Sequence, residues 1–200
     1  MARKGPNTQA ISMDELKELQ AHPAFNVAVD LLGSDLVLTD GQNESHSLPI
    51  HEVEPYEGLT QKQYIKGYQA VKRDVRETFL AWSRGKPSLN VIVEHSDDPE
   101  DISVVHIRQV EIDGKRESIS KAVTDILGIK RSDFAKGSEG FADFRPLVAR
   151  SLDEQEIDDS RSKLRVVPRK VQGGREIRRV SGAGNVNNSL GRFVKVENGN

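Results

Sequence analysis

The sequence predicts an α+β fold: a small mixed or antiparallel sheet with one long amphipathic helix and shorter helices, followed by an extended basic C-terminal arm. Two observations support this prediction. Strand-like and helix-like segments alternate between residues 25 and 128, and the residues after 152 are rich in charge and glycine but poor in large apolar groups. We therefore expect a compact α+β domain at 1–152, an acidic linker at 153–162 and an extended basic arm or β-hairpin at 163–200.

The first sixty residues predict a short helix and a hairpin. Ser12 is followed three residues later by a glutamate, which forms a capping box and predicts a helix that begins there. Two runs rich in Val and Leu, 25–32 and 35–40, are separated by a Gly-Ser pair and predict a β-hairpin. The segment 41–58 is polar and contains prolines, so we expect a loop with one edge strand at most.

The long amphipathic helix is predicted at about 59–84. Thr60 begins a second capping box, and Gly85 follows the last expected turn. The apolar residues that recur at spacings of three and four are Tyr64, Tyr68, Val71, Val75, Phe79 and Trp82. The basic residues that share the opposite face are Lys62, Lys66, Arg73 and Arg84. This basic face is either a solvated surface or a site for phosphate groups or an acidic partner.

The middle of the chain predicts two strands and a helix. The apolar runs 88–95 and 102–112 are typical of strands, and an Asp-Gly pair at 113–114 marks the end of the second. A helix is expected at 117–128, where a glycine ends it, and a further short helix at 142–152.

Charge is strongly segregated along the chain, although the net charge is only -2. Residues 1–60 hold three basic and ten acidic residues, and 61–150 hold sixteen and fourteen. Residues 151–160 hold five acids and no base, whereas 161–180 hold eight bases and one acid. Blocks of this kind are more often interaction segments than parts of a core.

The basic arm is the strongest candidate for a binding segment. Its cationic residues are Lys163, Arg165, Arg169, Lys170, Arg175, Arg178 and Arg179, and they alternate loosely with Val, Leu and Ile. The pattern predicts a basic β-hairpin or two extended strands. No aromatic residue that could stack on a base occurs in the arm before Phe193. Neutralisation of phosphates and docking on an acidic protein surface, such as the acids of residues 1–60, both stay open.

Residues 122–136 resemble a helix-turn-helix in spacing. The residues that would hold its two helices together are Val123, Leu127, Ile129 and Phe134, with Gly128 in the turn. Thr124 stands where a small residue is usual, and glycines at 137 and 140 shorten the second helix. The alternative interpretation is an ordinary helix with a C-capping glycine.

A second weak pattern is that of a Mg²⁺-dependent nuclease. Glu94 ends one expected strand, and Asp113 and Lys115 follow the next one. In such nucleases carboxylates hold the metal and a lysine stabilises charge at the phosphate. Asp-Gly is also the commonest hairpin turn, however, which is the simpler interpretation.

Other sites are not expected. The chain has no cysteine, which excludes disulfides, thiolate metal sites and cysteine nucleophiles. The acidic runs near 97–101 and 153–159 lack the calcium-loop spacing, and His46 and His51 lack the spacing of a zinc site. We expect no cofactor, no resident metal and no catalytic residue. No signal peptide or membrane span is recognisable, so we expect a soluble, intracellular protein that does not bind membranes.

Three classes of function fit these features. The first is a non-enzymatic assembly or interaction subunit of a larger complex, similar in organisation to subunits of virions or nucleoprotein particles, whose arm orders on protein subunits. The second is a nucleic-acid-binding protein that uses the basic arm, the basic helix face and residues 122–136. The third is a Mg²⁺-dependent nuclease-like protein. The charge segregation favours the first class.

Overall fold

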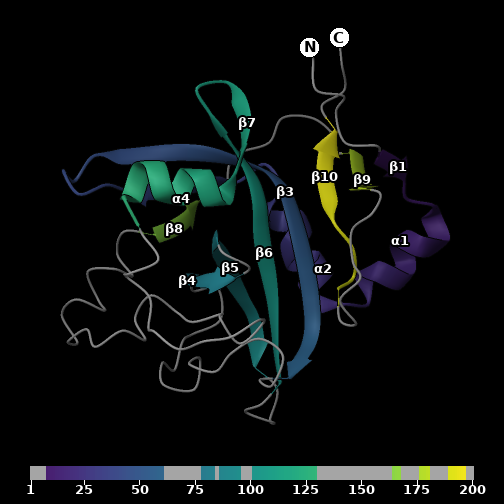
Figure 1. The fold of residues 1–200 in the computed structure, drawn as a ribbon. Coiled ribbons are helices and arrows are strands. Elements are labelled where there is room, and N and C mark those ends of the chain that lie inside the picture. Colours follow the sequence, from purple (N-terminus) through teal and green to yellow (C-terminus); the bar gives the residue numbers. More distant parts are fainter. Residues whose placement is uncertain are drawn as a thin grey trace.

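The computed structural model describes residues 8–60, 78–83, 86–95, 101–129, 164–167, 176–180 and 189–196. Within these residues the chain is an α+β protein in which every strand pairing is antiparallel (Figure 1). The helices are α1 (Met13–Gln20), α2 (Pro23–Leu31) and α4 (Ile119–Leu127). The strands are β1 (Thr8–Ala10), β2 (Asp35–Thr39), β3 (Ser45–Thr60), β4 (Thr78–Ser83), β5 (Lys86–His95), β6 (Asp101–Ile112), β7 (Lys115–Ser118), β8 (Leu164–Val167), β9 (Glu176–Val180) and β10 (Phe193–Val196).

The sheet has the strand order β1-β9-β10-β3-β6-β5-β4, with β7 added to β6, β2 added to the first part of β3, and β8 added to β2. The long strand β3 therefore joins two groups of strands. Its residues 45–49 pair with β2, and its later residues pair with β6 on one side and β10 on the other. Figure 1 shows β10, β3 and β6 running side by side through the middle of the molecule. The segment that the sequence assigned to a loop at 41–58 is thus largely a central strand.

The sequence missed β3 because its apolar pattern does not alternate regularly. Ile50 and Val53 are both fully buried in the core although they are three residues apart. Irregularities in the pairing of β3 with β6 lie between Ile50 and Val53, and a bulge of this kind shifts which side chains face the core. Pro49 and Pro55 also lie within the strand, where proline is unusual.

The predicted strand at 25–32 is wrong, because Pro23–Leu31 forms the helix α2. The apolar residues of this run fit both a period of two and a helical period, so the pattern alone is ambiguous. Pro23 occupies the first helical turn, where its fixed φ and missing N–H are tolerated. From β3, the Glu57 carboxylate then accepts a hydrogen bond of 3.0 Å from the Ala24 backbone N–H, which caps this end of the helix.

The long helix expected at 59–84 is not confirmed. Its first residues belong to β3, which runs to Thr60, and its last residues form β4, Thr78–Ser83. Residues 61–77, with Lys62, Lys66 and Arg73, lie outside the described residues, as does Arg84. Ser83 pairs with Lys86, so only two residues separate β4 from β5. The glycine at 85, which the sequence interpreted as a helix end, lies outside the described residues.

The other local predictions that fall on described residues are confirmed. Ser12 caps α1 by accepting a hydrogen bond from the Glu15 N–H, as expected. Ser118, which the sequence did not single out, caps α4 in the same way. Strands β5 and β6 occupy the two predicted ranges. Asp113 and Gly114 both have positive φ, which is the geometry of a two-residue hairpin turn between β6 and β7. The short helix expected at 142–152 lies outside the described residues.

One apolar core fills the space between the helices and one face of the sheet. Helix α2 packs against β3, β5 and β6, while α4 packs against β2, β5 and β6. Phe25 of α2 meets Phe193 of β10 edge to face, with ring centroids 5.0 Å apart. Both rings are almost completely buried, so the C-terminal strand β10 is part of the same core as the N-terminal helix.

Candidate functional site

The C-terminal segment joins the N-terminal half of the chain through pairs of strands. Strand β8 pairs with β2, whereas β9 pairs with β1 and with β10, and β10 pairs with β3. The sequence left open a basic β-hairpin or two extended strands, and β8 and β9 are separate extended strands that pair with different partners and not with each other. Lys163, Arg169, Lys170 and Arg175 lie outside the described residues, and Arg165 lies on β8.

Arg179 of β9 is anchored on its own chain. Its guanidinium forms an ion pair with Glu15 of α1 and donates a hydrogen bond of 3.2 Å to the Leu190 carbonyl. It also lies over the ring of Phe193, 5.7 Å from the ring centroid. Gly191 leaves the space that this arrangement needs, since a Cβ at that position would lie 2.9 Å from the Arg179 Nε. One cation of the predicted basic arm is thus paired with an acid of the predicted acidic region.

Arg178 does not share the partners of Arg179. Its guanidinium pairs with Glu176 two residues earlier on the same strand, at 2.8 Å. The two arginines that the sequence grouped together therefore face opposite sides of the sheet, because neighbouring residues of a strand alternate between its faces.

A second set of charges lies where β10 meets β3, and we call it the polar cluster. It consists of Glu52 and Glu54 on β3, Asn90 on β5, His106 and Arg108 on β6, and Arg192 just before β10. Its glutamate and asparagine side chains are almost completely withheld from solvent, with Glu52 and Glu54 each only 3% exposed. Buried carboxylates require compensation, so the partners of these two groups decide whether the fold tolerates them.

The carboxylates are compensated by arginines from two directions. The Arg192 Nε lies 3.2 Å from a Glu52 oxygen and 3.5 Å from a Glu54 oxygen. The Arg108 Nε lies 3.5 Å from the same Glu54 oxygen. The Arg192 Nε is within ion-pair distance of both glutamates but is not aligned for a hydrogen bond with either. The attraction is therefore that of close charges without the added strength of a directed bond.

Ser189 completes the connection between the C-terminal segment and β3. Its hydroxyl donates to the second Glu54 oxygen at 3.2 Å, and the Leu190 N–H donates to the Pro55 carbonyl at 3.1 Å. Arginine and serine from residues 189–192 thus both contact the buried acids of β3. The polar cluster thus joins residues 189–192 to strand β3 through contacts between opposite charges.

Two groups of the polar cluster have shifted pKa values. Burial raises the pKa of the Glu52 carboxyl and the charge of Glu54 adds to the rise, while Arg192 and Arg108 oppose it. Burial lowers the pKa of His106 to about 3, and the positive charges of Arg108 and Arg192 contribute. The imidazole of His106 is therefore neutral at neutral pH and adds no third positive charge to the cluster.

Asn90, His106 and Glu54 form a row across three strands. Register places Asn90 directly opposite His106, and His106 directly opposite Glu54, so the three side chains share one face of the sheet. Asn90 is 1% exposed, and neither polar atom of its side-chain amide has a hydrogen-bond partner in the part of the chain that the structure describes. An unsatisfied buried amide costs about 1–3 kcal/mol, so this position is less favourable than an apolar one.

The residues of the nuclease pattern do not come together. Glu94 pairs with Ser103 near the start of β6, whereas Asp113 follows the end of that strand. Ten residues of extended strand span about 33 Å, so the two positions are too far apart to share a metal ion. Asp113 lies in the hairpin turn, as the simpler interpretation predicted.

The helix-turn-helix pattern is described only in its first half. Residues 122–127 are helical, and Gly128 ends the helix with a left-handed φ of 64°. This geometry is that of an ordinary C-capping glycine. Residues 130–136, which would form the second helix, lie outside the described residues.

Comparison with models of known protein families and with curated protein sequences finds no match for this chain. Within the described part of the chain, no helix has the length and apolar character needed to cross a membrane.

The sequence did not single out any member of the polar cluster. Glu52 and Glu54 lay in a segment assigned to a loop, and Arg192 was outside the basic run that ends at 180. A signal was present, because alternation of acids around Val53 is the pattern of a strand with one apolar and one polar face. It was obscured by the neighbouring prolines.

Proposed function

We propose that this protein is a non-enzymatic assembly or interaction subunit of a larger complex, and that its C-terminal strands add to the body of a neighbouring subunit. In this proposal β8, β9 and β10 of one subunit pair with β2, β1 and β3 of its neighbour, as they pair with these strands within one chain. The observation that carries the proposal is the charge-matched contact of the C-terminal segment with the acids of residues 1–60, through Arg179 with Glu15 and Arg192 with Glu52 and Glu54.

Strand addition is a suitable mode of assembly for this surface. Met13 is the one large hydrophobic side chain among the described residues that is exposed, so their surface offers no broad apolar patch for a protein interface. Backbone pairing at a strand edge needs no such patch, because main-chain hydrogen bonds supply affinity and side-chain pockets supply specificity. The buried Phe193 and the paired arginines provide that specificity.

The connection between body and C-terminal strands is long. Helix α4 ends at Leu127 and β8 begins at Leu164, so 36 residues separate the two elements. Exchange of identical elements between subunits creates no new contacts, and its cost is set mainly by the connection between the exchanged parts. A connection of this length gives the C-terminal strands the reach to pair with a second chain.

Cysteine pairs test the proposal in the full chain, which has no cysteine of its own. Val37→Cys with Arg165→Cys joins β2 to β8, and Ala10→Cys with Arg178→Cys joins β1 to β9, at positions that face each other in the register. Assembly by strand addition predicts disulfide-linked oligomers in each double variant. It also predicts linked heterodimers when the two single variants of a pair are mixed.

A closed monomer would give the opposite result, with each disulfide formed inside one chain and no linked dimer from mixed single variants. Light scattering of the full chain and of a chain ending at residue 160, with and without nucleic acid at two salt concentrations, supplies the second measurement. Loss of oligomers on truncation supports the proposal. Binding of DNA or RNA that weakens steeply with salt would instead favour the nucleic-acid-binding alternative.

A further inference from the structure

Three histidines of the described chain each contact a carboxylate, and the three pairs differ in their surroundings. The distances are 2.7 Å from His22 to Glu57, 2.9 Å from His51 to Glu111, and 3.2 Å from His46 to Asp40. Glu57 also caps helix α2, and His51 is itself almost completely buried. The pair at His46 is the one in which a second carboxylate approaches the same imidazole.

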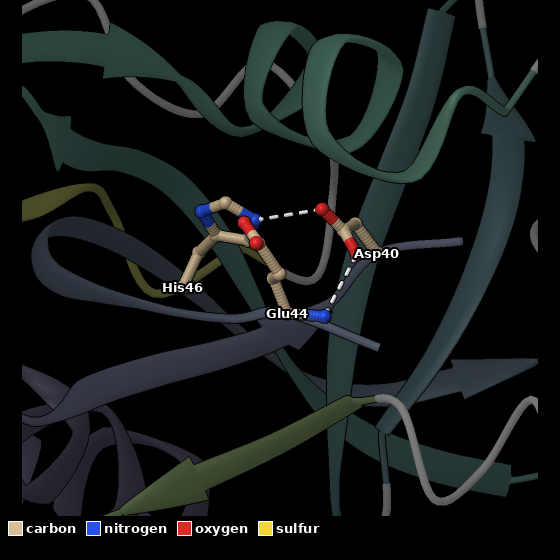
Figure 2. A group of neighbouring side chains, drawn as sticks. All are labelled: Asp40, Glu44 and His46. Carbon is tan, nitrogen blue, oxygen red and sulfur yellow. Dashed lines mark hydrogen bonds and ion pairs between the residues drawn. The ribbon is translucent and has the colours of Figure 1, made fainter. Parts of the chain in front are cut away.

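This third group lies on the hairpin that connects β2 to β3. One oxygen of Asp40 accepts hydrogen bonds from the backbone N–H groups of Gln42 and Glu44, at 2.8 and 2.9 Å. Those two bonds fix the carboxylate in the turn. The other oxygen of Asp40 faces the Nε2 atom of His46, a residue near the start of β3 (Figure 2). The turn therefore holds one carboxylate oxygen and one imidazole nitrogen in a defined position.

Glu44 brings the second carboxylate. Figure 2 shows its side chain directed to the same side of the turn as His46 and Asp40. One ligand atom from each of the three residues lies within 4.8 Å of the other two. Among the described residues, neither Asp40 nor Glu44 forms an ion pair with lysine or arginine. Two carboxylates thus gather around one imidazole, and no lysine or arginine of the described residues offsets their repulsion.

We propose that Asp40, Glu44 and His46 bind a divalent transition-metal ion of the Zn²⁺ class. The donor set of one imidazole nitrogen and two carboxylate oxygens suits such ions, whereas Ca²⁺ and Mg²⁺ prefer oxygen donors throughout. Two ligands bonded to a tetrahedral zinc ion lie about 3.4 Å apart, given bond lengths of about 2.0–2.2 Å. The separation of 3.2 Å between His46 and Asp40 is already close to that value.

Binding requires little rearrangement. The metal takes the place of the hydrogen bond between His46 and Asp40, and the exposed Glu44 side chain rotates inward to complete three protein ligands. The double positive charge of the metal ion offsets the negative charges of the two carboxylates. Water fills the coordination positions that the protein leaves open, as at other zinc sites with three protein ligands.

The test is calorimetric titration of the metal-free full chain with ZnCl₂, and with CaCl₂ in a parallel series. We expect one Zn²⁺ per chain and no comparable binding of Ca²⁺. His46→Ala and Glu44→Gln should each weaken Zn²⁺ binding about tenfold or more, because even the loss of a residue that only supports a metal ligand has an effect of that order. Asp40→Asn keeps an acceptor for the two turn N–H groups while it removes a charged ligand, so it should weaken binding without unfolding the hairpin.

Matched controls use the other two pairs. His22→Ala and His51→Ala each remove a histidine that contacts a single carboxylate, and both should leave the Zn²⁺ affinity unchanged. Circular dichroism of every variant establishes that it is folded. Undetectable binding of Zn²⁺ at millimolar concentration would overturn the proposal. So would Zn²⁺ binding that survives His46→Ala, or equal affinity for Ca²⁺, because each would leave the imidazole without a role.

Discussion

The two faces of the central sheet are stabilised in different ways. On one face Leu89, Ile107 and Val53 lie opposite one another across β5, β6 and β3, and all three are completely buried in the apolar core. On the other face the row one residue further along is Asn90, His106 and Glu54. The same strands therefore carry an apolar row and a polar row back to back.

The difference shows how the C-terminal segment depends on both faces. Phe193 inserts into the apolar core next to Phe25, while Arg192, its neighbour in sequence, compensates the buried acids on the opposite face. Burial of an apolar ring contributes through the area removed from water, whereas the arginine prevents the large cost of unpaired buried charge. Adjacent residues of one segment thus anchor it by two unrelated physical effects.

The largest effect is expected on the apolar face. Phe193→Ala removes a ring that is completely buried and in edge-to-face contact with Phe25, so we expect a loss of about 4 kcal/mol in the free energy of unfolding. Urea denaturation followed by circular dichroism measures it. Met13→Ala is the control, because Met13 is 67% exposed and its truncation should change stability by less than about 0.5 kcal/mol. Equal effects of the two variants would mean that β10 is not part of the core.

A somewhat smaller loss is expected on the polar face. Arg192→Met leaves Glu52 and Glu54 with Arg108 as the nearest cation, and removal of one partner from buried charges costs about 3 kcal/mol. Glu52→Gln removes one of the stranded charges and should recover part of that loss. A double-mutant cycle measures the coupling. If Arg192→Met costs the same with Glu52 or Gln at position 52, the two side chains are not coupled and the contrast between the faces is overstated.

The polar face also makes stability depend on pH through His106. Its pKa is lowered from 6.5 to about 3, so below pH 6.5 the unfolded chain binds a proton that the folded chain does not. The contribution of the neutral imidazole to the free energy of unfolding is therefore fully present above pH 6.5. It is lost on acidification, by at most about 1.4 kcal/mol per pH unit, until the folded-state pKa of about 3 is reached.

The measurement is the unfolding free energy of wild type and His106→Asn between pH 7 and pH 4. Titration of the carboxylates affects both proteins, so the difference between them isolates the imidazole. We expect the variant to lose less stability than wild type as the pH falls. Parallel curves would contradict a neutral, desolvated His106.

The smallest effect is a gain. Asn90→Leu replaces an amide without partners by an apolar side chain of similar shape, and we expect about 1 kcal/mol of added stability. The thermal midpoint compared with wild type measures it, and Asn90→Ala separates the loss of the amide from the filling of its space. A loss of stability in Asn90→Leu would show that the amide is satisfied in solution, and the polar row would then be better stabilised than the contacts described above indicate.

Local signals in the sequence were sufficient where one residue type determines one geometry. Ser12 predicted a helix start, Gly128 predicted a helix end, and the Asp-Gly pair at 113–114 predicted a hairpin turn, because these residues satisfy backbone groups or adopt positive φ within a few positions. The uneven placement of acids and bases can likewise be read from the sequence alone, whereas the interpretation of the charge blocks as interaction segments stays a prediction. None of these features depends on what lies across the sheet.

Tertiary structure decided what a period or a composition left ambiguous. The run Pro23–Leu31 fits strand and helix equally in its apolar spacing, and its packing against β3, β5 and β6 accompanies the helical form. The segment around Val53 became a central strand despite two prolines, because an irregular register brings Ile50 and Val53 to the same core. The contact of Arg192 with Glu52 and Glu54 joins residues about 140 positions apart, and charge counts along a chain carry no information about such pairing. Sequence by itself determined the local caps, turns and charge blocks, whereas only the fold could decide which charges meet, because that depends on strand order and register.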